Sequence, residues 1–212
     1  MNDITLTENE IKYQSLFESA RDAIFVINVE GMYIVDANKQ ACKLLQYTRE
    51  ELMKKKVFDL HPPEIRKIIL QDFFDRVLKI NNNLFETVIL NREGRRIPVE
   101  MSTGEVYKIG EMHVLTGFFR DITERKKSER EVLYLSYHDQ LTGLYNRRFY
   151  QKELKRIDTQ RNLPMTIVIC DINGLKLIND SFGHVVGDEL LKKVAEVLKS
   201  MCRVDDIIAR LG

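Results

Sequence analysis

Three strand-like runs joined by short turns constrain the fold more than any other feature of the sequence. The runs are LFETVIL, RIPVEMS and MHVLTGFFR, and the turns between them contain NREGR and Gly110. Runs rich in β-branched and aromatic residues, separated by turn residues, predict antiparallel neighbours. Two further short runs, DAIFVIN and MYIVD, flank a turn that ends in Gly31 and predict a hairpin. Residues 1–120 are therefore expected to contain five antiparallel strands.

Helical patterns lie between the hairpin and the three-stranded meander. Residues 38–45 show such a pattern, and Thr48 followed by Glu51 has the spacing of a capping box. Pro62 and Pro63 stand where a further helix, IRKIILQDFFDRVLK, is expected to begin. This order favours an α+β domain with the helices grouped on one face of the sheet.

A charged segment begins where the strand pattern ends. Asp121 and Glu124 have the spacing of a helix N-cap pair, and DITERKKSEREVLYLS indicates one helix. Behind it, MTIVIC is a continuous apolar run between Pro164 and Asp171, which predicts a strand buried on both faces. We then expect a helix (LKLIND), a loop (SFGHVVGD), a helix (ELLKKVAEVLKSM) and a strand that starts within RVDDIIARLG. These elements indicate an α/β domain that stops partway.

The chain therefore divides into three expected parts. Residues 1–120 form a first domain, residues 121–136 form an interdomain helix, and residues 137–212 form a second domain. A chain of 212 residues is long enough for two small domains.

Composition excludes several classes of protein. Lys and Arg number 33 and Asp and Glu number 32, so the net charge of +1 gives no reason to expect nucleic-acid binding. No apolar run approaches the about 20 residues that a membrane helix needs, and the start, MNDITLTENE, is unlike a signal peptide. The three cysteines (Cys42, Cys170 and Cys202) show no metal-ligand spacing. We expect a cytoplasmic protein without a membrane segment.

The first domain resembles a PAS domain. The resemblance rests on YQSLFESARDAIFVIN at its start and GFFRDITERKKSE at its end. It implies the PAS fold, with a five-stranded antiparallel sheet and an internal pocket whose ligand stays unknown. Cys42 lacks the surroundings of a flavin-adduct cysteine and is expected to be a small buried hydrophobe. His61 can ligate haem in principle, but the family often has a His-Pro pair here, so a structural role is favoured.

The second domain resembles a GGDEF domain, whose family condenses two GTP molecules into cyclic di-GMP. HDQLTGLYNRR, DINGLKLINDSFGHVVGDELL and ARLG occur in the family's order over residues 137–212. The resemblance implies an α/β fold similar to the palm of nucleotidyl cyclases, truncated in this sequence. Gly212 matches the first glycine of the GG(D/E)EF signature. The rest of the signature, including a metal-binding carboxylate, lies outside the sequence.

The same resemblance assigns roles at the expected metal site. Asp171 and the Ile172 carbonyl are expected to hold Mg²⁺, a hard cation that prefers oxygen ligands. Asp171 also follows the predicted strand MTIVIC, at the strand end where site residues of α/β sheets gather. The alternative for Asp171 is a helix N-cap. Lys176 matches the family's phosphate-binding lysine, and Asn173 stands where the family usually has Asp.

Two further pairs match family positions. Asn179 and Asp188 match the residues that recognise guanine, and a carboxylate can accept from the guanine N1–H and N2–H₂ groups. The alternative for Asp188 is the N-cap of the following helix. Arg203 and Asp206 match an Arg-x-x-Asp site for inhibition by the product. The alternative for this pair is a local ion pair.

We therefore expect a PAS-regulated diguanylate cyclase whose 212 residues alone are inactive. The resemblance implies GTP and cyclic di-GMP as ligands. It also implies a homodimer, because two domains must face each other for the reaction. One alternative is a non-catalytic PAS dimerisation or ligand-binding module with a degenerate GGDEF remnant. Another is a regulatory GGDEF part in a larger protein with a phosphodiesterase domain.

Overall fold

The computed structural model describes residues 7–71, 84–203 and 205–212. The chain forms two compact units, Met1–Lys126 and Lys127–Gly212. No helix in the described ranges is both long enough and apolar enough to cross a membrane.

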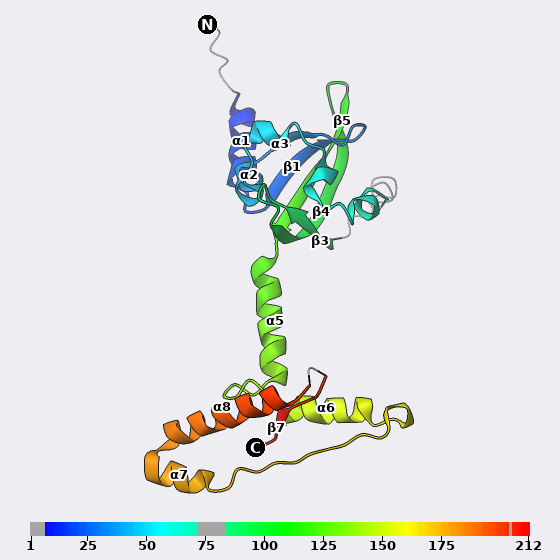
Figure 1. The fold of residues 1–212 in the computed structure, drawn as a ribbon. Helices are drawn as coiled ribbons and strands as arrows, with labels where there is room; N and C mark the ends of the chain where they lie inside the picture. Colours follow the sequence, from blue (N-terminus) through cyan, green and yellow to red (C-terminus); the bar gives the residue numbers. More distant parts are fainter. Residues whose placement is uncertain (1–6, 72–83, 204) are drawn as a thin grey trace. The chain divides into compact units, whose positions relative to one another are not determined.

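The first unit is built on a five-stranded antiparallel sheet in the order β2-β1-β5-β4-β3 (Figure 1). β1 and β2 form the predicted hairpin, and β3, β4 and β5 form the predicted meander. β5 is the central strand, so it pairs with β1 as well as with β4. The predicted fold class is confirmed. The strands are β1 (Ala23–Asn28), β2 (Ile34–Ala37), β3 (Phe85–Leu90), β4 (Arg96–Ile109) and β5 (Met112–Asp121).

Short helices connect β2 to β3. The predicted capping box is present, with the Thr48 hydroxyl accepting from the Glu51 backbone at the start of α3. Residues 66–71 are helical, and the remainder of that predicted helix lies outside the described residues. The helices named in the first unit are α1 (Glu8–Ser19), α2 (Lys39–Leu45), α3 (Arg49–Leu52) and the 3₁₀-helix η1 (Val57–Leu60).

β1 is buried on both faces of the sheet. Phe25 and Ile27 belong to the large core cluster, which also contains residues of α2, α3 and η1. Ile24 and Val26 belong to a second cluster, where Phe17 of α1 packs against them. Because successive side chains of a strand point to opposite faces, a strand covered on both faces needs an unbroken apolar run. This requirement explains the sequence AIFVI.

Asn38 is a buried polar side chain whose carboxamide makes four hydrogen bonds. Its Oδ1 accepts from the backbone N–H groups of Ile24 at 3.0 Å and Ala41 at 2.9 Å. Its Nδ2 donates to the backbone carbonyls of Phe17 at 3.1 Å and Asp22 at 3.0 Å. One side chain therefore joins α1, the start of β1 and the first turn of α2. Buried polar groups are stable in a core when they are paired in this way.

The second unit consists mainly of helices. α5 (Thr123–Tyr137) begins in the first unit and ends in the second, and Asp121 accepts from the Thr123 N–H at 2.8 Å. Asn146 caps α6, and its side chain accepts from the Phe149 N–H. β6 and β7 pair in parallel. The other elements are β6 (Tyr145–Asn146), α6 (Arg147–Ile157), the 3₁₀-helix η2 (Gln160–Asn162), α7 (Leu175–Phe182), α8 (His184–Met201) and β7 (Ala209–Arg210).

The predicted buried strand MTIVIC is wrong for this structure. Residues 165–170 have no regular secondary structure. The side chains of Ile167, Val168 and Ile169 are 50%, 77% and 81% exposed. A strand needs backbone partners on neighbouring segments, and in the described ranges no strand pairs with this segment.

The N-cap roles considered as alternatives for Asp171 and Asp188 do not fit the structure. α7 begins after Gly174, three residues beyond Asp171. α8 begins after Gly183, so the predicted loop is shorter and Asp188 lies in the second turn of the helix. Both helices instead start at glycines with positive φ, 78° at Gly174 and 86° at Gly183.

We expect Asn38→Ala to lower the free energy of unfolding of the first unit by at least about 3 kcal/mol, because three buried backbone groups and the part-buried Asp22 carbonyl lose their partner. Urea denaturation followed by circular dichroism measures this loss. Asn38→Asp retains the two accepted hydrogen bonds and should fall between wild type and Asn38→Ala. Thr48→Ala, which removes an exposed cap, should cost only about 1 kcal/mol. An Asn38→Ala loss no larger than that of Thr48→Ala would contradict the assignment.

Candidate functional site

The residues expected to bind guanine meet where α7 packs against α8. Lys176 lies exposed in the first turn of α7, and Asn179 lies one turn further on. The Asn179 carboxamide lies directly against Gly187 of α8, where a Cβ atom would be only 1.8 Å from its Oδ1. Asp188 follows Gly187 and is exposed. The absence of a side chain at Gly187 therefore allows Asn179 to reach the chain beside Asp188.

Asp171 lies exposed in the irregular segment before α7, and Ile172 is half-buried beside it. In the described ranges, no group of three His, Cys, Asp or Glu side chains is arranged to hold a metal ion. The Asp171 carboxylate and the Ile172 carbonyl still offer oxygen donors. Mg²⁺ is commonly bound by one or two carboxylates together with substrate phosphates. The two donors fit part of such a site.

Arg203 and Asp206 form a local turn after α8. The Asp206 carboxylate accepts from the Arg203 backbone N–H at 2.8 Å, and the Asp206 N–H donates to the Arg203 carbonyl at 3.1 Å. Both residues are exposed. The contact therefore involves the Arg203 backbone, unlike the side-chain ion pair considered as the alternative.

One cluster in the second unit was not predicted. The Asp139 carboxylate accepts from the Thr142 N–H at 2.9 Å and from the Thr142 hydroxyl at 2.6 Å. It also accepts from the Arg210 guanidinium at 3.2 and 3.3 Å. Partial burial acts to raise the pKa of Asp139, but the hydrogen bonds from Thr142 and Arg210 outweigh it and hold that pKa below its ordinary value. The only signal in the sequence was that both residues lie in family-like motifs.

His61 lies in the core of the first unit, beside a cavity of about 10 Å³. Its Nδ1 is 2.9 Å from the Val88 carbonyl. A carbonyl only accepts, so Nδ1 carries the proton, and the buried Nε2 has no hydrogen-bond partner in the described structure. Ligand pockets usually measure about 300 to 1,000 Å³, so the described cavity does not fit haem. This placement agrees with the structural role favoured for His61. Burial lowers the pKa of His61 below its ordinary value.

We expect the first unit to lose stability as the pH falls below about 6.5, the ordinary pKa of histidine. The lowered pKa means that the folded state favours neutral His61, so acid favours unfolding. Measuring the free energy of unfolding between about pH 5 and about pH 8 tests this expectation. His61→Leu should be less stable at neutral pH but have a flatter pH profile. Equal slopes for wild type and His61→Leu would refute the expectation.

Two family profiles match the chain. The family described as "PAS fold" matches residues 11–122, and the family described as "Diguanylate cyclase, GGDEF domain" matches residues 136–212.

Relatives match most or part of the chain. Signaling protein YkoW of Bacillus subtilis (strain 168) is 29% identical over 211 residues, which cover 98% of this chain and 25% of YkoW. Diguanylate cyclase DgcM of Escherichia coli (strain K12) is 28% identical over 184 residues, which cover 84% of this chain and 44% of DgcM. The probable diguanylate cyclase DgcE of Escherichia coli (strain K12) is 36% identical over 115 residues, covering 53% of this chain and 10% of DgcE. The chain thus spans less than half of the length of each of these relatives.

A solved structure supports the fold of the first unit. The PAS domain of a protein from Colwellia psychrerythraea has a TM-score of 0.50 and 26% sequence identity, and the match covers 54% of this chain and 98% of that chain.

Proposed function

The chain belongs to the PAS-domain signalling proteins, with a GGDEF domain of the diguanylate cyclase family behind its PAS domain, and we propose that it contributes to making cyclic di-GMP from two molecules of GTP. The observation that carries this proposal is the contact of Asn179 with Gly187, next to Asp188. It brings the Asn179 amide against α8 at the residue that precedes Asp188.

This pair suits the guanine base of GTP. The Asp188 carboxylate can accept from guanine N1–H and N2–H₂, and the Asn179 amide offers both a donor and an acceptor. Lys176 is exposed in the first turn of α7, where its ammonium group can offset phosphate charge. The three residues therefore form the proposed substrate site.

Asp171 and the Ile172 carbonyl would hold Mg²⁺ in this proposal. When bound, the ion supplies positive charge at the α-phosphate and favours ionisation of the attacking 3′-hydroxyl. Asn173 is neutral where the family usually has a second acidic residue. Asp171 is therefore the only carboxylate assigned to the metal in this sequence, and a second is expected from the remainder of the GGDEF signature.

Product inhibition and dimerisation complete the proposal. The Arg203 guanidinium can donate to guanine O6 and N7 of cyclic di-GMP, and Asp206 can accept from the opposite edge. Two copies of the chain are needed because each GGDEF domain presents one GTP to the other. The reaction draws on GTP, which places the proposed activity in the cytoplasm.

A non-catalytic role is the second candidate. Asn173 is neutral, and only one carboxylate is assigned to the metal, so these residues alone would bind Mg²⁺ weakly. Without that chemistry, the α7–α8 pair would bind a guanine nucleotide, and the PAS domain would act as a dimerisation or ligand-binding module.

We expect residues 1–212 alone to form no cyclic di-GMP from GTP and Mg²⁺, because one carboxylate cannot hold two metal ions at the α-phosphate. Joining them to the corresponding C-terminal part of DgcM should produce turnover, measured by chromatography. In that fusion, Asp171→Ala should abolish product formation, whereas Asp158→Ala, at an exposed carboxylate after α6, should have no effect. Turnover by residues 1–212 alone would refute the expectation, and an inactive fusion would favour the non-catalytic role.

We expect Asn179→Ala to weaken GTP binding about tenfold, the size of one lost base contact. Gly187→Ala should have a similar effect, because the new methyl group would occupy the place of the Asn179 amide. Titration calorimetry of the same fusion measures both affinities. Lys193→Ala, at an exposed residue of α8 that pairs with Glu196, is the control and should bind GTP normally. If Gly187→Ala weakens binding but Asn179→Ala does not, packing of the helices and not base recognition is responsible.

A further inference from the structure

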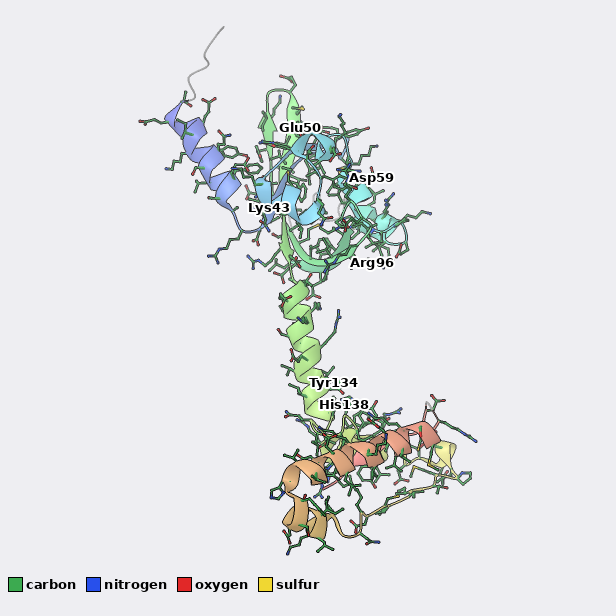
Figure 2. All side chains as sticks on the ribbon, turned by 60° about the vertical axis from the view of Figure 1, so that its left-hand side comes forward. Lys43, Glu50, Asp59, Arg96, Tyr134 and His138 are labelled. Atoms are coloured by element: carbon green, nitrogen blue, oxygen red, sulfur yellow. The ribbon has the colours of Figure 1, made fainter. Side chains whose placement is uncertain are left out.

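The end of α5 and the strand β7 are both bound to the same short turn, residues 138–147. On the side of α5, the Asn146 amide donates to the carbonyls of Ser136 at 3.0 Å and His138 at 3.4 Å. The ring of His138 stacks on Tyr134, with 3.9 Å between the ring centroids. Figure 2 labels both residues near the end of α5. The His138 ring also lies 4.7 Å from the ring of Tyr145. The last turns of α5 therefore contact this turn through hydrogen bonds and aromatic rings.

The opposite side of the turn is bound to β7. Tyr145 and Asn146 form β6, which pairs in parallel with β7, and the Tyr145 N–H donates to the Ile208 carbonyl at 3.1 Å. The Arg147 guanidinium donates to the Leu211 carbonyl at 2.8 Å. These contacts bind the backbone of residues 208–211 to the turn.

Asp139 joins the two sides. Its carboxylate orders the turn through Thr142 and pairs with Arg210, two residues before Gly212. The Asp139 and Arg210 side chains are only 24% and 26% exposed, so water screens this pair less than it screens a surface ion pair. Charge-assisted hydrogen bonds of this kind also restrict geometry.

We propose that residues 138–147 form a joint that sets the position of residues 208–211 according to the position of the last turns of α5, with Asp139 as its central positioning residue. The signature of the proposed cyclase begins at Gly212, so the consequence for catalysis rests on the proposed function. Movement that reaches the end of α5 then reaches the start of the signature through the joint. No residue of the joint contacts the nucleotide in this proposal.

Hydrogen exchange of residues 1–212, read by mass spectrometry without nucleotide, tests the joint. Asp139→Asn should speed exchange of the Tyr145 amide and of the β7 amides at least about fivefold, because the contacts that close them are weakened. Exchange in the middle of α8, around the buried Ala195, should stay unchanged and shows that the unit is still folded. Arg156→Ala, whose guanidinium pairs with Glu153 within α6, is the matched control and should leave β7 unchanged.

Coupling across the joint needs a double-mutant cycle. Tyr134→Ala removes the ring that stacks on His138 and should also speed exchange in β7. In the Asp139→Asn background, Tyr134→Ala should increase the exchange rate in β7 much less than it does in the wild-type chain. The proposal would be overturned if the effects of the two substitutions on β7 exchange were fully additive, or if Tyr134→Ala did not change β7 exchange. The turn would then be a purely local structure.

A second variant separates a loss of the joint from unfolding of the second unit. If Asp139→Asn loses protection throughout α8, Arg147→Ala replaces it, because that substitution removes only the donor to the Leu211 carbonyl. It should speed exchange in β7 without changing α8, and unchanged exchange in β7 would overturn the proposal. Since no GTP is present, the joint can fail while the proposed function holds, and it can hold while the proposed function fails.

Discussion

The first unit depends on the buried carboxamide of Asn38. Its four backbone partners lie on α1, before and within β1, and on α2, so it determines where β1 enters the sheet. β1 then pairs with β5 over its full length, and β5 leads directly into α5. The backbone of Ile122 also donates to the Pro98 carbonyl of β4 at 3.0 Å. The start of α5 is therefore bound to a strand that lies in the same hydrogen-bonded sheet as the Asn38 site.

Much of the first unit could be predicted because its signals are local. Runs of β-branched and aromatic residues, short turns and the Thr48–Glu51 capping box each depend on residues a few positions apart, and each was found where expected. The role of Asn38 could not be predicted in this way. It was visible only as the start of a helical pattern, whereas its bonds to Ile24 and Phe17 span 14 and 21 residues. The same limit applies to His61, because its burial and its bond to Val88 depend on the packed core.

The second unit shows the opposite balance. Motif resemblance identified the residues of the candidate site, but local pattern misplaced some of them. Apolar continuity predicted a strand at residues 165–170, although pairing with a neighbour decides whether a strand forms. Gly187 was expected within the loop SFGHVVGD, but it lies within α8 and leaves room for Asn179. No pattern of neighbouring residues in the sequence indicates that two helices approach closely at a given glycine. The same is true of the contact between Asp139 and Arg210, whose members are 71 residues apart.

That separation also has a consequence for biosynthesis. At roughly 5 to 20 residues per second, a ribosome needs about 4 to 14 s to reach Arg210 after it has added Asp139. During this interval the sheet of the first unit can already form, since its last strand ends at Asp121. The parallel pair of β6 and β7 cannot form, because half of it does not yet exist. The nascent chain therefore passes through a stage with a completed PAS sheet and an open turn behind it, and closure of that turn is among the last folding events of these 212 residues.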